Sequence, residues 1–101
     1  MKKGESEVLR AAVEFLHRCK ATLRKAEVVQ VTAIGSRPIT RKVATFDLNG
    51  HPTASVCYSW VDPSIRQQTV HLRAVLESVS VHSPQEAVRW LLLLMMAEEH
   101  G

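Results

Sequence analysis

The chain contains six consecutive large apolar residues, Leu91 to Met96, within the stretch RWLLLLMMAEEHG. A helix that packs on one side only needs about half of such positions to be apolar, because its side chains point all around the axis. The run is also far shorter than the ~20 residues that a membrane span requires. A helix at this place must therefore be covered on two sides, which constrains the fold more than any other feature.

The residues just before this run have the pattern of a helix start. Ser83 suits the N-cap, Pro84 suits the first helical position, and Glu86 stands where a capping box places its acidic residue. We therefore predict a helix from Pro84 to about Glu99.

At 100° per residue, the residues of this helix divide into two arcs. The arc expected to pack on a sheet consists of Ala87, Val88, Leu91, Leu94 and Met95. The opposite arc consists of Arg89, Leu92, Leu93, Met96 and His100. Fully burying one large apolar side chain contributes about 1.5–3 kcal/mol, so the opposite arc is expected to be an interface. Its partner is either a second copy of the chain or the N-terminal helix lying beside it.

Residues 6–26 have apolar residues at steps of three and four, which is the spacing of one helical stripe. The expected stripe consists of Val8, Ala12, Phe15, Leu16, Cys19, Leu23 and Ala26. From Glu27 onward, a high density of β-branched residues predicts a strand, which the segment Gly35-Ser36-Arg37-Pro38 ends. A second strand is expected over Ile39–Asp47.

The segment Asp47-Leu48-Asn49-Gly50 predicts a hairpin between the second strand and a third strand over Thr53–Val61. A two-residue turn would pair Leu48 with His51. A type I turn with a bulge would pair Asp47 with His51, and we favour it because it places six apolar residues on one face. Those residues are Ala44, Phe46, Ala54, Val56, Tyr58 and Trp60.

Residues 69–81 fit both strand and helix spacing, and their Val and Thr content favours a strand with a bulge near Glu77-Ser78. The expected fold is therefore α+β, with one domain over residues 1–101. It comprises an N-terminal helix, a three- to four-stranded antiparallel sheet and a C-terminal helix, with both helices packed on one sheet face. Residues 65–78 are strand in the four-stranded version and helix in the alternative.

The sequence lacks the Walker loop, GxGxxG, HExxH, GxSxG and Cys/His zinc patterns. Cys57 could act as a nucleophile with His71 on a neighbouring strand, but a half-buried strand cysteine is the favoured interpretation. We therefore expect no enzyme activity, and no catalytic, cofactor-binding or metal-binding residues. Cys19 and Cys57 lie far apart without a CxxC spacing, and no apolar signal segment follows the first residues, which predicts a cytoplasmic protein.

Positive charge is concentrated in the first half of the chain. Residues 1–50 hold ten Lys/Arg and five Asp/Glu, while residues 51–101 hold three and five. A basic half can attract nucleic acid or an acidic protein.

The predicted element order, the Gly35/Pro38 break, the Asn49-Gly50 hairpin and the helix start Ser83-Pro84-Gln85-Glu86-Ala87 resemble the double-stranded-RNA-binding domain. That family contacts RNA through its first helix, the loop between its first two strands, and a lysine cluster that opens its last helix. Pro84 and Gln85 occupy the positions where those lysines are expected. The resemblance implies RNA contacts by Arg10, His17, Arg18, Arg37, Arg41 and Lys42.

Two functions are expected from these observations. The first is a small non-catalytic interaction protein that acts through its C-terminal helix, either as a homodimer or by binding an unidentified protein. Its candidate interface residues are Arg89, Leu92, Leu93 and Met96. The alternative is a nucleic-acid-binding module that uses the basic half through Arg10, Arg18, Arg37, Arg41 and Lys42. Neither function involves a membrane.

Overall fold

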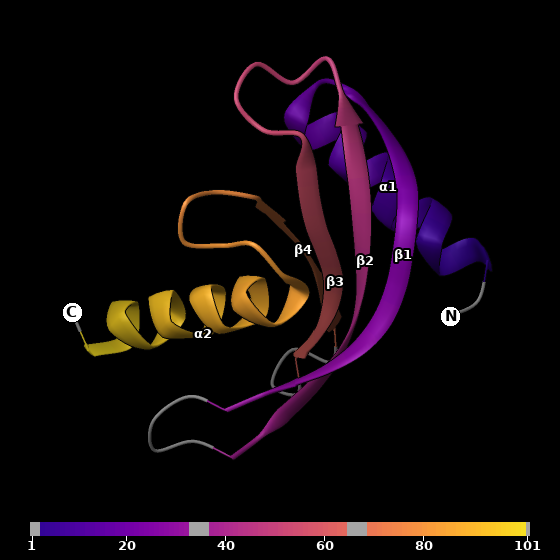
Figure 1. The fold of residues 1–101 in the computed structure, drawn as a ribbon. Coiled ribbons are helices and arrows are strands. Elements are labelled where there is room, and N and C mark those ends of the chain that lie inside the picture. Colours follow the sequence, from indigo (N-terminus) through magenta and orange to yellow (C-terminus); the bar gives the residue numbers. More distant parts are fainter. Residues whose placement is uncertain (1–2, 33–36, 65–68, 101) are drawn as a thin grey trace.

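The computed structural model of the chain describes residues 3–32, 37–64 and 69–100. Its elements, in chain order, are α1 (Lys3–His17), β1 (Lys20–Val31), β2 (Ile39–Asn49), β3 (Val56–Ser64), β4 (Thr69–Leu76) and α2 (Pro84–His100). The strands form one antiparallel sheet in the order β1-β2-β3-β4 (Figure 1). The predicted α+β fold is confirmed in its four-stranded version. Residues 33–36 of the predicted break and residues 65–68 of the ambiguous segment lie outside the described residues.

Both helices contact the sheet, as predicted, but they pack against opposite faces of it (Figure 1). Side chains alternate between the faces of a strand, and β3 shows this division directly. Tyr58 and Trp60 belong to the core that α2 covers, while Cys57, one residue before Tyr58, belongs to the core that α1 covers. The expectation that both helices share one face is therefore corrected, and each face has its own core.

The helix predicted over residues 6–26 ends at His17. Arg18 follows with φ 53°, a left-handed conformation that stops a helix, and Lys20 already pairs with Asn49 of β2. Cys19, Leu23 and Ala26 therefore do not belong to a helical stripe. Pairing with a distant strand outweighs the local helical spacing there.

The buried side of α1 also differs from the predicted stripe. Leu9 and Val13, four residues apart, are fully buried, while Val8, Phe15 and Leu16 are exposed. The Glu14 carboxylate ties the helix to β1, because its Oε2 accepts the backbone N–H of Ala21 at 2.8 Å. This hydrogen bond lowers the pKa of Glu14.

The predicted register between β2 and β3 is wrong. Asp47 pairs with Val56 rather than with His51, and Ala44 pairs with Ser59. The shift is five residues, an odd number, so it moves every side chain of β3 to the opposite face relative to β2. The chain does turn at Gly50, which has φ 95°, but a longer loop follows in which His51 Nδ1 accepts the N–H groups of Thr53 and Ala54.

The start of α2 agrees with its sequence signals. Ser83 Oγ accepts the backbone N–H of Glu86 at 3.2 Å, and Glu86 Oε1 accepts the N–H of His82 at 2.9 Å. The bulge predicted near Glu77-Ser78 is replaced by a turn, in which Ser78 and Val81 form an isolated bridge. Val81 is consequently buried against α2, whereas Val79 at the turn is exposed.

Candidate interface and adjoining pocket

One stripe of α2 faces the sheet. Ala87 and Val88 are buried, and Leu91 packs beside them against the core that contains Tyr58 and Trp60. These α2 positions lie on one side of the helix because they recur at steps of one, three and four. Figure 1 shows that the C-terminal half of α2 extends beyond the strands. Of the apolar residues in that half, Leu93 and Leu94 are left largely uncovered.

A second apolar stripe lies on a different side of α2. It consists of residues at positions i, i+3, i+4 and i+7, namely Trp90, Leu93, Leu94 and Ala97, and we call it the outer stripe. Trp90, Leu93 and Leu94 are 44%, 46% and 42% exposed, respectively. This spacing is typical of a helix that packs lengthwise against another helix.

The predicted interface residues differ in exposure. Leu93 belongs to the outer stripe and Arg89 is exposed, but Leu92 and Met96 are half-buried. Leu94, predicted to face the sheet, is instead 42% exposed and belongs to the outer stripe. The alternative in which α1 lies beside α2 is wrong, since the two helices pack on opposite faces.

A pocket of about 270 Å³ lies between α2 and the sheet. Its polar wall comes from three neighbouring strands, with Arg41 on β2, Asp62 on β3 and Arg73 on β4. Ile39 and Trp60 add apolar surface from the sheet. The pocket residues contributed by α2 are Val88, Leu91, Leu92 and Met95.

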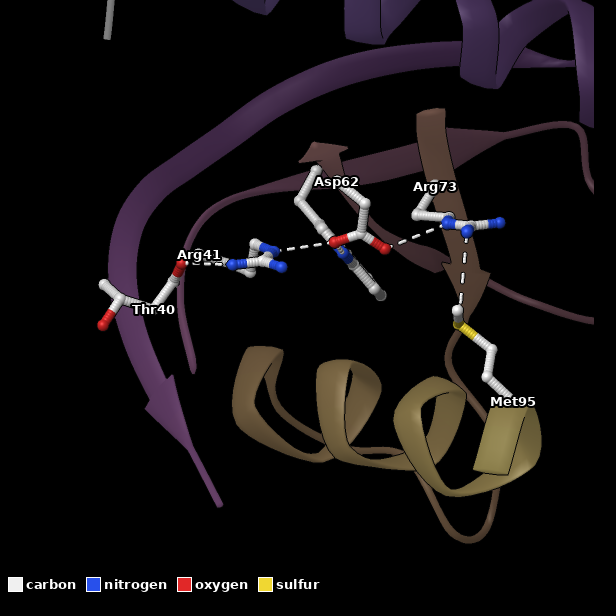
Figure 2. Close-up of polar contacts among 6 residues, drawn as sticks. Thr40, Arg41, Asp62, Arg73 and Met95 are labelled. Atoms are coloured by element: carbon white, nitrogen blue, oxygen red, sulfur yellow. Dashed lines mark hydrogen bonds and ion pairs between the residues drawn. The ribbon is translucent and has the colours of Figure 1, made fainter. Parts of the chain in front are cut away.

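The Asp62 carboxylate lies between the two arginines (Figure 2). Its Oδ1 accepts Arg41 Nε at 2.7 Å and Trp60 Nε1 at 2.9 Å, and its Oδ2 accepts Arg73 Nε at 3.0 Å. The side chains of Arg41, Asp62 and Arg73 are 21%, 17% and 29% exposed, so water screens these ion pairs only in part. Two positive groups and one negative group leave the network with a net charge of +1.

No protein-family model, curated protein or solved structure matches the chain. Over residues 3–32, 37–64 and 69–100, no helix is long and apolar enough to cross a bilayer. The same residues contain no group of three or more His, Cys, Asp or Glu side chains placed to hold a metal ion.

Sequence reasoning did not identify the pocket network, because its three charged residues come together only through the register of β2, β3 and β4. Trp60 pairs with Arg73, and Asp62 pairs with His71. A usable signal is present in β4, where Arg73 lies two residues before the buried Val75 and so shares its face. A charged residue in phase with a buried one predicts an inward-facing charge that needs a partner.

The helix α1 and its sheet face also expose apolar side chains. Val8, Phe15 and Leu16 form an outward surface on α1, which we call the α1 patch, and Phe15 is 84% exposed. Beyond α1, the sheet exposes Val28, Val70 and Leu72. Sequence analysis assigned the α1 patch to the core, although the alternative pair Leu9 and Val13 was visible as a four-residue step.

The five residues proposed to contact nucleic acid do not form one surface. Arg41 and Lys42 are consecutive in β2, so they point to opposite faces, and Arg41 is bonded to Asp62. Arg10 is bonded to Glu7 and Glu14 on its own helix. Arg18, just after α1, and Arg37, two residues before β2, are both exposed. The sheet also has four strands, whereas the resemblance to the double-stranded-RNA-binding domain is to an order of one helix, three strands and one helix.

Cys57 and His71 are not brought together. Cys57 pairs with Leu76 and faces the α1 core, whereas His71 pairs with Asp62 and faces the pocket. Burial raises the pKa of the Cys57 thiol to about 12, which keeps it protonated and unreactive near neutral pH.

Proposed function

We propose that this chain is a small self-associating interaction protein in which the outer stripe of α2 pairs with the same stripe of a second copy. The observation that carries this proposal is that Trp90, Leu93 and Leu94 are about half exposed on a helix whose other side already packs against the core. On a helix that packs on one side only, the outward positions are normally charged or polar. Exposed apolar residues at helical spacing therefore indicate a surface that contacts a partner.

A second copy is the occupant that the stripe fits best. The segment from Trp90 to Ala97 contains no charged residue, so two such stripes meet without repulsion. Around a twofold axis, each residue meets its own equivalent or a neighbour of it, which makes one stripe complementary to itself. The C-terminal half of α2 also extends from the sheet, where a second helix can approach it (Figure 1).

The dimer is expected to be weak and concentration-dependent. With 17 residues, α2 is about 25 Å long. A single stripe of that length gives less contact than the ~1,200–2,000 Å² that a standard stable interface buries. The proposed role is therefore reversible association rather than an obligate assembly.

The decisive measurement is solution mass by light scattering over a concentration series. Wild type should approach twice the 11.3 kDa of one chain as concentration rises. The double variant Leu93→Glu with Leu94→Glu should remain monomeric, because two buried charges per copy would face each other in the dimer. Its urea unfolding midpoint should stay close to that of wild type, since both side chains are exposed.

A matched control places the same change on the other helix. Phe15→Glu with Leu16→Glu introduces two adjacent charges into the α1 patch and should leave the dimer intact. The proposal is overturned if wild type stays monomeric at every concentration. It is also overturned if the α1 double variant abolishes the dimer while the α2 double variant preserves it.

A further inference from the structure

We propose that the pocket between α2 and strands β2–β4 binds a small amphipathic monocarboxylate, meaning a molecule with one carboxylate group and a compact apolar body. The proposal rests on two features that share one cavity: the Arg41–Asp62–Arg73 network with its excess positive charge, and an apolar wall from α2. It does not depend on self-association, because none of the outer-stripe residues lines the pocket.

Each arginine uses only part of its hydrogen-bonding capacity within the protein. Both donate to Asp62 through Nε, and Arg41 Nη1 also donates to the Thr40 carbonyl oxygen at 2.8 Å (Figure 2). Arg73 Nη2 lies 4.0 Å from the Met95 sulfur, too far for a strong hydrogen bond. Among the described residues, Arg41 Nη2 and Arg73 Nη1 have no acceptor, so these donors are available to a ligand.

Asp62 fixes the positions of the arginines but cannot neutralise both. Its two oxygens already accept three hydrogen bonds, one of them from Trp60. A guanidinium that is largely removed from water is costly unless a negative charge balances it. A bound anion would supply that charge to side chains that are already held in place, which lowers the entropic cost of binding.

The charge and shape of the site favour a carboxylate over a phosphate. The excess of one positive charge matches a monoanion, whereas Asp62 would repel the second charge of a phosphate dianion. The planar carboxylate also matches the planar donor set of a guanidinium group.

The rest of the pocket determines the size and polarity of the ligand body. Leu91, Leu92 and Met95 provide an apolar wall opposite the arginines. The volume of about 270 Å³ is small, slightly below the ~300–1,000 Å³ typical of ligand pockets. The ligand body is therefore compact, such as one aromatic ring or a short branched chain.

The test is a titration of the full chain with phenylacetate, phenylacetamide and inorganic phosphate, followed by NMR of the Trp60 Nε1–H and arginine Nε–H resonances. Phenylacetate should shift these resonances saturably. Phenylacetamide has the same shape without the charge, so its affinity should be at least about tenfold lower. Phosphate should also bind more weakly than phenylacetate, because it leaves the apolar wall uncovered.

Variants identify the residues responsible. Arg41→Gln and Arg73→Gln should each weaken phenylacetate binding at least about tenfold. Arg24→Gln is the matched control, since it removes the same charge from an exposed pair with Asp47 outside the pocket and should bind like wild type. If a glutamine variant fails to fold, Arg73→Lys retains the charge without the planar fork and should show an intermediate affinity.

Three outcomes would overturn the proposal: no saturable shift with phenylacetate, equal affinity for the acid and the amide, or an equal loss of binding in Arg24→Gln. Because the outer stripe does not line the pocket, Leu93→Glu with Leu94→Glu should bind phenylacetate normally. Light scattering therefore tests self-association, and the phenylacetate titration separately tests ligand binding in the pocket.

Discussion

The two faces of the sheet are covered in different ways. On one face, α1 contacts all four strands and buries Leu9 and Val13 against Phe46 and Cys57. On the other face, α2 buries only its first half, and a charged network and a pocket remain beside its second half. The same sheet thus has one face whose core contains no ion pair among the described residues and one face where charge and cavity meet.

The difference shows that the direction in which a helix crosses a sheet determines how much of that sheet face it covers. The helix α1 crosses every strand, so its inward residues Leu9 and Val13 are fully buried, and only the α1 patch on its outer side stays exposed. The C-terminal half of α2 extends past the strands (Figure 1), so the helix covers this face of the sheet only in part. Arg41, Asp62 and Arg73 line the pocket that remains between these strands and α2. The face covered by α2 is therefore the better candidate for function.

The largest expected effect separates the buried and exposed sides of α1. Leu9→Ala should lower the free energy of unfolding by about 2–5 kcal/mol, because Leu9 is fully buried and leaves a cavity. Phe15→Ala removes a larger side chain but should change it by no more than about 0.5 kcal/mol, because Phe15 projects into solvent. Urea unfolding of both variants measures the two values. A loss for Phe15→Ala equal to that for Leu9→Ala would mean that the predicted stripe, not the observed one, faces the sheet.

The helix boundaries show which features local sequence signals can predict. The start of α2 was predictable because Ser83, Pro84 and Glu86 act within one helical turn. The end of α1 was not, because the segment from Lys20 is held by β2, which is distant in the sequence. Local helical spacing alone cannot report such a partner.

The candidate site depends on register in the same way. The Asn49-Gly50 signal identified a turn, but the loop that follows determines that Asp47 pairs with Val56. With the predicted register, Phe46 and Trp60 would share a face, and the partners of Asp62 could not be deduced. The outer stripe was only partly predictable, because the helical run predicts a second apolar side but not the point where the sheet ends.

A medium effect is expected in the charged network of the α2 face. Asp62→Asn should lower the free energy of unfolding by about 1–3 kcal/mol, because two partly buried guanidinium groups lose their shared counter-charge. Asp47→Asn, which breaks the exposed pair with Arg24, is the control and should have a clearly smaller effect, because water screens that pair. Urea unfolding at neutral pH compares the two variants. If Asp62→Asn were as mild as Asp47→Asn, the network would be solvated, and the charge argument for the pocket would lose its basis.

The smallest effect concerns His17, the last residue of α1. Burial lowers the pKa of His17, and the nearby His51, whose ring centroid lies 5.8 Å away, lowers it further. The Nε2 atom is buried and has no hydrogen-bond partner among the described residues. The unfolded chain therefore binds a proton at His17 more readily than the folded chain does. Its contribution to stability is fully present above about pH 6.5, the ordinary histidine value, and is lost as the pH falls through the lower folded value.

An NMR titration of the His17 ring tests this assignment directly. Its midpoint should lie below about 6.5 in wild type. In His51→Gln the midpoint should rise only part of the way towards that value, because burial is the larger cause and remains. Urea midpoints should accordingly fall from neutral to mildly acidic pH by more in wild type than in His17→Gln. A His17 midpoint at or above the ordinary value would show that water reaches the ring, and α1 would then pack less tightly at its last turn than its fully buried Leu9 and Val13 indicate.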